Sequence, residues 1–429
     1  MMNGNSDYER RIAWFKEARF GMFIHWGLYA LPARHEWVKS RERISNEEYQ
    51  KYFDHFNPDL YDPREWARLA KEAGMRYMVL TTKHHEGFCL WDSDLTDYKA
   101  PNTPAGRDLL RPFVEAARAE GLRVGFYYSL IDWHHPAYPP DIYHPMRDND
   151  EFLATAKGRD MREYVAYMHG QIRELLTRYG PIDIIWCDFS FPDRAYREMP
   201  GKGREDWQSE KLMAMIRELM PGILINNRLD LPGDFTTPEQ YQPRRRVQVD
   251  GTPVTWEACQ TLNGSWGYDR DNLDWKTPDL LVRMLIDAVS KDGNMLLNVG
   301  PTARGEFEPR AVATLRAIGE WMRLHSRAIY GCGPAPFTPP PDCRYTMNAA
   351  GDRLYLHIFS WPFKHLYLEG LADKVAYAQF LNDASEVAMR ASGGVLSTAP
   401  GPEENTLLLQ LPVQKPDVLV PVIELFLHK

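Results

Sequence analysis

Between Phe20 and Val299, six strand-like apolar runs alternate with helix-like runs, and this alternation limits the folds that the chain can adopt. A helix between two successive strands makes those strands parallel neighbours in one sheet. So many units in a stretch of this length favour a closed (β/α)8-like TIM barrel over a doubly wound sheet. We therefore expect barrel strands at residues 20–26, 77–82, 124–129, 182–186, 223–226 and 295–299.

Two of the intervening helices have readable starts. Asp62 is expected to cap a helix that has Pro63 at its first position and ends at Gly74. Thr277 and Pro278 start a second helix in the same way. No glycine-rich phosphate loop follows the first strand, which weakens a dinucleotide-binding alternative.

The pattern changes after Tyr330. Residues 331–341 are rich in glycine and proline and are typical of a linker. Short strands without amphipathic helices follow at residues 354–359, 365–368, 375–381, 406–411 and 418–426, which predicts a small antiparallel β-sandwich. The expected domains are a catalytic barrel at 1–333 and a sandwich at 342–429 that braces it.

Net charge and cysteine content restrict the partners and the cellular compartment that we expect for this protein. A net charge of −8 without a basic block argues against nucleic acid or a membrane as the partner. The five cysteines are scattered, which suits a reducing compartment. The first residues are polar and show no signal peptide, so the expectation is a cytoplasmic protein. The sequence leaves open whether the protein forms a homo-oligomer.

A charged residue at the end of one buried strand is the first candidate for chemistry. The run Ile182 to Trp186 is nearly all apolar, yet Asp188 follows it closely. An unpaired charge there is costly, so Asp188 is paired or functional. In a parallel barrel this end of the strand belongs to the active-site face. Cys187 is expected to point away from Asp188, as a structural residue.

Other strands also end in polar residues, and only the rim of a barrel brings such ends together. Adjacent histidines such as His84 and His85 point to opposite sides of a strand, so they do not favour a metal site. Neutral imidazoles and an arginine suit hydrogen bonding to several hydroxyl groups instead. The residues in question are His25, Glu36, Trp37, His84, His85, Tyr127, Asp188 and Arg228.

Glycoside hydrolysis needs a second carboxyl group beside Asp188. Glu239 lies in a proline-containing, loop-like segment, where acid/base groups are often carried. Glu257 lies on an expected strand beside Trp256, where burial would raise its pKa. On these grounds Glu239 and Glu257 are nearly equal candidates for the second carboxyl group.

An ordered set of motifs resembles the α-L-fucosidases of glycoside hydrolase family 29. The resemblance runs from about Tyr8 to Tyr330, and its motifs are 20-FGMFIHWG-27, 82-TKHHEGF-88, 127-YYS-129, 186-WCD-188 and 293-GNMLLNVGP-301. It implies a retaining exo-glycosidase that hydrolyses terminal α-L-fucosides through a covalent fucosyl-enzyme intermediate, without a metal or other cofactor. The implied partner is a fucosylated oligosaccharide or glycoside.

The resemblance also implies residue roles. Asp188 matches the nucleophile, and Glu239 matches the acid/base position best, with Glu257 in reserve. Trp266 matches an aromatic that packs against the methyl group of the sugar. One departure is Glu86, where Asp commonly follows the histidine pair; its extra methylene is able to shift His85. The residues that match the fucose-holding positions are His25, Glu36, Trp37, His84, His85, Tyr127 and Arg228.

Two alternatives remain at this stage. The first is a related glycosidase for another L-sugar, such as an α-L-galactoside, which differs from a fucoside at the methyl group. The second is a catalytically silent carbohydrate-binding protein, against which the presence of both Asp188 and Glu239 argues.

Overall fold

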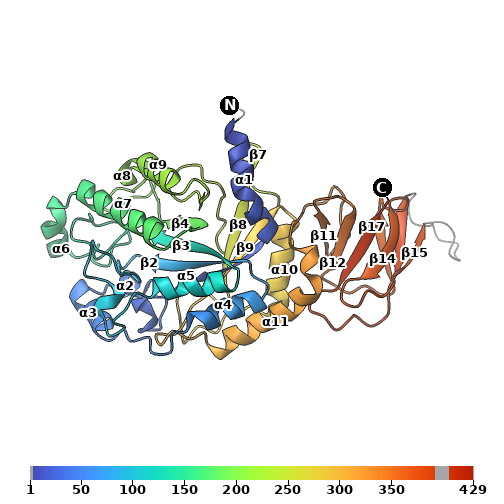
Figure 1. The fold of residues 1–429 in the computed structure, drawn as a ribbon, viewed down its shortest axis with the longest axis horizontal. Helices are drawn as coiled ribbons and strands as arrows, with labels where there is room; N and C mark the ends of the chain where they lie inside the picture. Colours follow the sequence, from blue (N-terminus) through green and yellow to red (C-terminus); the bar gives the residue numbers. More distant parts are fainter. Residues whose placement is uncertain (1–2, 392–404, 429) are drawn as a thin grey trace.

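The computed structural model describes residues 3–391 and 405–428, so that residues 1–2, 392–404 and 429 of the predicted domains lie outside it. The molecule is elongated, with a helix-covered barrel at one end and a smaller domain of β-sheets at the other (Figure 1). Within the described ranges, no helix combines the length and the apolar composition that crossing a bilayer requires.

Seven parallel strands form the sheet of the larger part, in the spatial order β5-β4-β3-β2-β1-β9-β8. Each pairs in parallel with its neighbours, as alternating strands and helices predict. The strands are β1 (Phe20–Ile24), β2 (Tyr77–Lys83), β3 (Arg123–Ser129), β4 (Ile184–Asp188), β5 (Leu224–Ile225), β8 (Trp256–Thr261) and β9 (Gly293–Val299).

Residues 235–239 occupy the place between β5 and β8 and close the sheet into a barrel. Backbone hydrogen bonds tie them to β8, from Cys259 N to Pro238 O at 3.0 Å and from Gln240 N to Cys259 O at 3.1 Å. This segment takes the eighth strand position, although it contains a proline and its pairing is broken into single bridges. The bridges are all parallel and join Asn226 to Phe235, Thr236 to Trp256 and Glu239 to Cys259.

Longer helices cover the outside of the barrel (Figure 1). The predicted starts are present: the side chain of Asp62 accepts from Arg64 N at the start of α4, and that of Thr277 accepts from Leu280 N at the start of α10. The covering helices are α4 (Pro63–Glu72), α5 (Leu110–Ala119), α7 (Met161–Arg178), α9 (Ser209–Leu219), α10 (Pro278–Val289) and α11 (Pro309–His325).

Shorter elements lie in the connections. They are α2 (Val38–Arg41), α3 (Asn46–Asp54), α6 (Asp150–Thr155), α8 (Arg204–Trp207), the hairpin β6 (Gln248–Val249) and β7 (Thr252–Pro253), and the 3-10 turns η1 (Leu28–Ala30), η2 (Ala100–Asn102), η3 (Ala156–Gly158) and η4 (Ser326–Ala328). The helices α2, α3 and α6 follow the C-terminal ends of β1 and β3, so they mark the face of the barrel where those strand ends meet.

Helix α1 (Asn3–Ala18) packs against the other, N-terminal end of the barrel. Its residues Ile12 and Phe15 are fully buried in the cluster that fills the barrel interior. The ring of Phe15 lies 5.5 Å from that of Tyr77, at the start of β2, and 4.9 Å from that of Phe235. The barrel is therefore a packed core that is plugged at this end, which leaves the opposite end for a site.

The C-terminal part is a sandwich of two antiparallel sheets, of strand order β10-β11-β12-β17-β14 and β13-β16-β15. Apolar residues from both sheets, such as Leu356 and Leu409, form the core between them. This confirms the predicted sandwich. The strands are β10 (Cys332–Gly333), β11 (Cys343–Asn348), β12 (Arg353–Ile358), β13 (His365–Glu369), β14 (Val375–Phe380), β15 (Ala388–Ala391), β16 (Thr406–Gln410) and β17 (Val422–Leu427).

The barrel and the sandwich share buried contacts. The indole of Trp321, on α11, donates to the carbonyl oxygen of Val420 at 2.8 Å. Arg327 pairs with Glu424 at 2.9 Å, and Arg344 pairs with Asp287 of α10 at 2.8 Å. Strand β10 ends at Gly333, the last residue of the predicted barrel domain, yet it pairs with β11 of the sandwich. The five cysteines are free and buried.

Candidate active site

Asp188 is the last residue of β4 and lies at the C-terminal end of the barrel. One carboxylate oxygen accepts from the Tyr127 hydroxyl at 2.8 Å, and the other accepts from an Arg228 nitrogen at 2.7 Å. Its side chain keeps 11% exposure. The carboxylate of Asp188, which the sequence predicted to be paired or functional, is therefore both ion-paired and hydrogen-bonded, and it faces the mouth of the barrel. Cys187 is buried in the core between strands and helices, as expected.

Arg228 joins Asp188 to Glu239. A second guanidinium nitrogen donates to Glu239 at 2.7 Å, and the third donates to the Thr237 hydroxyl at 2.9 Å. The guanidinium lies over the Trp186 ring, 4.6 Å from its centre. Burial disfavours its charge, but Asp188 and Glu239 outweigh burial and raise the pKa of Arg228 above its usual value. Two carboxylates are thus held by the two ends of one permanent cation.

Glu239 ends the segment that closes the barrel, and its side chain is 40% exposed. The backbone of this segment pairs with β8 as a strand would, and this pairing fixes the position of the Glu239 carboxylate in the barrel. The structure thus brings Glu239 to the same cation as Asp188.

Glu257 has a different position. It is the second residue of β8, beside Asn294 near the start of β9, and it is fully buried in the barrel interior. The Tyr77 hydroxyl and the Trp186 indole, at 3.2 Å, both donate to its carboxylate. Burial raises the pKa of Glu257 to about 7. The expected pKa shift is present, but this carboxyl lies beneath Trp186 and away from the mouth.

Hydrogen-bonded partners fix the orientation of two histidines. His25 Nδ1 lies 2.7 Å from the side-chain oxygen of Asn298, whose amide nitrogen donates to Trp266 O at 2.6 Å. His85 Nδ1 lies 2.7 Å from the Ser129 hydroxyl, which itself donates to Ile131 O. Both partners therefore accept, and the proton of each imidazole is on Nδ1. Burial, followed by the neighbouring His84, lowers the pKa of both histidines well below the usual value. Each presents an unprotonated Nε2 as an acceptor.

His84 lies between these two, with ring centres 5.6 Å from His25 and 3.9 Å from His85. Its Nδ1 is buried without a hydrogen-bond partner in the described chain, and the Glu86 carboxylate lies 3.5 Å away. The Glu86 departure leaves the His85 contact to Ser129 in place.

Glu36 and Trp266 complete the rim. One oxygen of Glu36 accepts from Trp266 N at 3.1 Å and from Gly267 N at 2.8 Å, which anchors the Trp266 loop. The other oxygen is buried without a hydrogen-bond partner in the described part of the chain. His35 Nδ1 lies near it but accepts from Trp37 N, so it does not donate to Glu36. Burial raises the pKa of Glu36. The ring of Trp266 lies 5.1 Å from that of His25.

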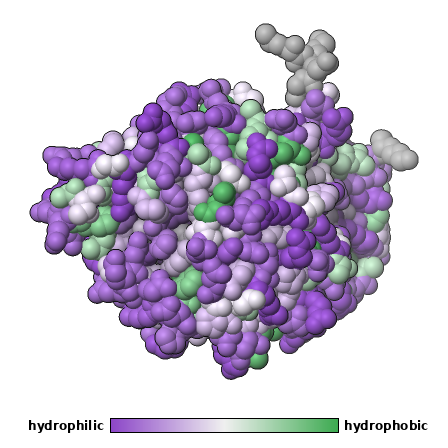
Figure 2. All heavy atoms as spheres, turned by 60° about the vertical axis from the view of Figure 1, so that its left-hand side comes forward, coloured by the Kyte–Doolittle hydropathy of each residue, from purple (hydrophilic) through white to green (hydrophobic). Residues whose placement is uncertain are grey.

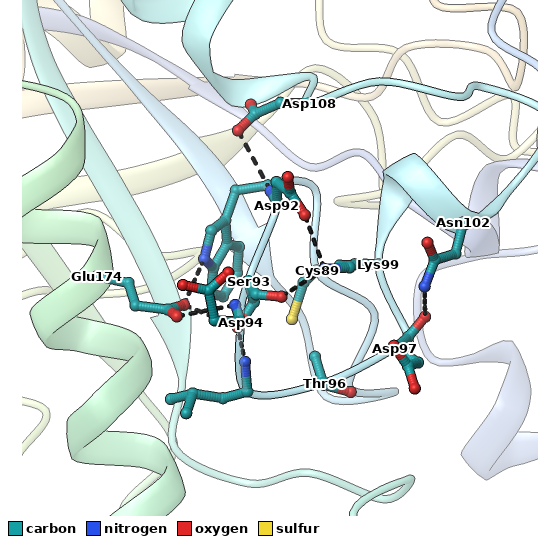
Figure 3. Close-up of polar contacts among 12 residues, drawn as sticks. Cys89, Asp92, Ser93, Asp94, Thr96, Asp97, Lys99, Asn102, Asp108 and Glu174 are labelled. Atoms are coloured by element: carbon teal, nitrogen blue, oxygen red, sulfur yellow. Dashed lines mark hydrogen bonds and ion pairs between the residues drawn. The ribbon is translucent and has the colours of Figure 1, made fainter.

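Glu174 of α7 anchors the loop that follows β2 (Figure 3). The Glu174 carboxylate accepts from the Trp91 indole at 3.0 Å, the Ser93 hydroxyl at 2.7 Å and Asp94 N at 2.9 Å. Arg178 pairs with the same carboxylate at 3.1 Å. This anchor makes the loop after β2 a fixed part of the barrel.

The face that carries α2, α3 and α6 is mostly hydrophilic, with apolar residues in small separate patches (Figure 2). A cavity of about 640 Å³ lies elsewhere, between α4 and α11, and contains none of the candidate residues. Converging polar side chains therefore identify the site better than concavity does.

All predicted rim residues meet at this site, whereas Glu257 does not. Sequence reasoning assigned no role to Asn298 or Ser129, although both lie in the quoted motifs. Their signal was a polar residue at the end of an apolar strand, the same signal that identified Asp188. No role was predicted for Phe189 either, although its ring contacts those of His85 and Trp37.

Comparisons with known proteins point to one family. The family model "Alpha-L-fucosidase" matches residues 3–327. The tissue alpha-L-fucosidase of Bos taurus is 31% identical over 82% of this chain and 75% of its own length. Among solved structures, alpha-L-fucosidase isoenzyme 1 from Paenibacillus thiaminolyticus is 50% identical, with a TM-score of 0.90 over 99% of this chain and all of that one. A family 29 alpha-L-fucosidase from Bacteroides thetaiotaomicron, described as a trapped covalent intermediate with 2-fluoro-fucosyl fluoride, is 31% identical, with a TM-score of 0.83 over 98% of this chain and 96% of that one.

Proposed function

The chain belongs to the alpha-L-fucosidase family of glycoside hydrolases, and on this premise we propose that it hydrolyses terminal α-L-fucosides with retention, through a covalent fucosyl-enzyme intermediate. The observation that carries the proposal is the Arg228 guanidinium, which holds Asp188 and Glu239 at 2.7 Å each. Retaining glycosidases need two carboxyl groups about 5–5.5 Å apart, and a shared guanidinium favours such a separation.

In the first step, a carboxylate oxygen of Asp188 attacks the anomeric carbon while Glu239 protonates the departing glycosidic oxygen. Tyr127 and Arg228 each donate to Asp188, so its carboxylate is oriented before the sugar arrives. In the second step, Glu239 takes a proton from water, the water attacks the same carbon, and the bond to Asp188 breaks.

The exposure of Glu239 supports its role, because the leaving group departs and the attacking water arrives on the open side of the site. Glu257 is fully buried beneath Trp186, so it is the weaker candidate. The two carboxyl groups supply both steps without a metal or an organic cofactor.

Recognition of fucose follows from the free acceptors of the rim. Nε2 of His25, Nε2 of His85 and one Glu36 oxygen are able to accept from sugar hydroxyl groups. The Trp266 ring beside His25 offers an apolar face to the methyl group of the sugar. The proposed partner is a fucosylated oligosaccharide or glycoside. Free, buried cysteines support a reducing compartment, and a cytoplasmic location is part of the proposal.

Trapping with 2-deoxy-2-fluoro-fucosyl fluoride, followed by peptide mapping, tests the function. The fluorine slows both steps, so the intermediate should accumulate on the peptide that contains Asp188. Label on another peptide would refute the assignment of the nucleophile. Turnover of an aryl α-L-galactoside faster than the matching α-L-fucoside would reassign the sugar, and binding of either without turnover would indicate a silent binding protein.

A further inference from the structure

Phe189, the residue after the proposed nucleophile, has an unusual backbone conformation. Its φ of 88° is the most positive of any described non-glycine residue, and most of the others lie between 48° and 66°. A bulky side chain in this region is an outlier that costs free energy, and it persists only where the surrounding structure imposes it.

The turn changes the direction of the Phe189 side chain. Along β4, Cys187 points into the core between the sheet and the helices, and Asp188 points to the barrel mouth. A continued strand would send Phe189 to the same side as Cys187. Instead, its ring centre lies 4.7 Å from that of His85 and 5.3 Å from that of Trp37.

Hydrogen bonds on both sides hold this turn in place. The carbonyl oxygen of Asp188 accepts from Leu130 N at 2.9 Å, which continues the pairing of β4 with β3. One residue further on, the Ser190 hydroxyl donates to Arg228 O at 2.8 Å. The backbone around Phe189 is therefore fixed by the two neighbouring strand ends.

Trp133 contacts the same two rings. Its ring centre is 5.5 Å from that of His85 and 5.4 Å from that of Trp37. His85 and Trp37 are thus each in contact with both Phe189 and Trp133. Ser129 fixes only one nitrogen of His85, so the tilt of the imidazole depends on these aromatic contacts.

We propose that Phe189 is a positioning residue, whose strained turn presses its ring against His85 and Trp37 and thereby orients both for the hydroxyl groups of the fucose unit. The proposal rests on the proposed function. It assigns Phe189 to the recognition of the fucose itself and not of the leaving group, because His85 and Trp37 match sugar-holding positions. The other ring contacts of Phe189 are with Tyr143 at 4.8 Å and Phe191 at 5.8 Å.

Two substitutions separate the ring from the strain. Phe189→Ala removes the ring and keeps a strained backbone, whereas Phe189→Gly removes the ring and relieves the strain. We expect the glycine variant to melt at a higher temperature than the alanine variant. Both should lose kcat/KM by about ten- to a hundredfold, because a small misplacement of binding groups is costly. Phe189→Tyr, which keeps the ring, should retain most activity.

The inhibition constant of free L-fucose gives a readout that reports only on the sugar side. It should rise by about tenfold or more in both the glycine and the alanine variants. In each variant, the loss of kcat/KM should be equal for fucosyl fluoride and for an aryl α-L-fucoside. Ala384→Gly relieves a φ of 59° at an exposed turn of the sandwich and serves as the control, with unchanged kinetics.

The following outcomes would overturn the inference. Activity that follows melting temperature, so that the glycine variant recovers, would indicate a merely structural role. An unchanged inhibition constant for L-fucose would place Phe189 on the leaving-group side, as would a loss confined to the aryl substrate. A wild-type protein that neither turns over fucosides nor binds L-fucose would refute the proposed function itself, while the comparison of melting temperatures would still test the strain.

Discussion

At the scale of single residues, Arg228 makes it possible for two carboxylates of like charge to share one small site. Its planar fork donates separately to Asp188 and Glu239, and its pKa is raised by both. A lysine has one compact ammonium group and is unable to hold both carboxylates in this geometry. The arrangement therefore depends on the shape of the guanidinium as well as on its charge.

Arg228→Lys should lower kcat/KM by about 10²-fold with an unchanged far-ultraviolet circular dichroism spectrum, because the two carboxylates lose their common anchor. Steady-state kinetics on an aryl α-L-fucoside measures this. Arg304→Lys is the matched control, since Arg304 forms a two-nitrogen pair with Asp59 on the exposed surface. Equal activity of the two variants would contradict the proposed bridging role.

Glu239→Gln should slow hydrolysis of substrates with poor leaving groups by about 10²- to 10⁴-fold, since proton transfer is lost. Fucosyl fluoride needs little protonation, so its first step should be nearly unaffected and the covalent intermediate should accumulate. Mass spectrometry of the quenched reaction would detect it. The same behaviour in Glu257→Gln, with a normal Glu239 variant, would exchange the two roles.

Much of the site could be predicted at this scale. Asp188, for example, was recognised from the sequence because a charged residue at the end of a buried apolar strand is unusual. The choice between Glu239 and Glu257 could not be made from residue chemistry alone. Glu239 follows a proline in a loop-like segment and Glu257 follows a tryptophan on an expected strand, yet acid/base groups occur in both settings, and it is the depth along the barrel that distinguishes them. Depth depends on the pairing register between β8 and β9, which is a property of the folded sheet.

At the scale of elements, Glu174 shows how a helix stabilises the loop after β2. Glu174→Ala would leave two buried donors, on Trp91 and Ser93, and the partly buried N–H of Asp94 without their acceptor, so we expect a loss of about 3 kcal/mol in the free energy of unfolding. Urea denaturation measures it, with Glu163→Ala on the exposed face of α7 as control. A loss no larger than that of the control would show that the loop is held by other contacts.

Glu257 lies inside the barrel and makes its stability depend on pH. Its folded-state pKa is about 7, against about 4.3 for a free glutamate. Between these values the folded state holds a proton that the unfolded state has lost. Stability from this group is therefore complete below about pH 4 and falls as pH rises to 7, by about 3 kcal/mol in total.

Glu257→Gln stays neutral at every pH and should lack this decline. The difference in unfolding free energy between the wild-type protein and this variant, measured in urea from pH 4.5 to 7.5, isolates the contribution of Glu257. A flat difference would mean that the carboxyl ionises normally in the barrel.

The barrel elements that the sequence predicts agree with the structure because their apolar runs are long. All six predicted barrel strands are present, with ends that differ by at most two residues. The eighth position was missed because residues 235–239 contain Pro238 and several polar side chains. They are extended because β5 and β8 flank them, and neighbouring backbone imposes a conformation that their own composition does not favour. The strands β10, β11 and β15 were also missed; β10 lies in the glycine- and proline-rich stretch 331–341, and β15 has only four residues.

At the scale of the whole molecule, barrel and sandwich are joined through a common core. Val420 and Val422 of the sandwich belong to the same buried cluster as the barrel helices, and Trp321 donates to Val420 O across the boundary. Charged pairs at the edge, such as Arg344 with Asp287, add to this contact. The linker-like composition between the two parts therefore does not imply independence.

We expect one cooperative unfolding transition for the whole chain. Circular dichroism and tryptophan fluorescence should give the same urea midpoint, because opening the boundary would expose Trp321 and its apolar neighbours. Two separate midpoints, with the sandwich unfolding first, would show that the two parts are thermodynamically independent.

The irregular closure of the barrel at residues 235–239 has a practical consequence. Unlike most of the other strand positions, it is followed by no covering helix, only by the small hairpin of β6 and β7. For protein engineering, the stretch from Asn227 to Thr255 is thus a replaceable cassette between two fixed ends. Exchanging it between homologues would replace Glu239 and Arg228 together, so the acid group and the cation that pairs with Asp188 would change as one unit, while β4, which carries Asp188, stays the same.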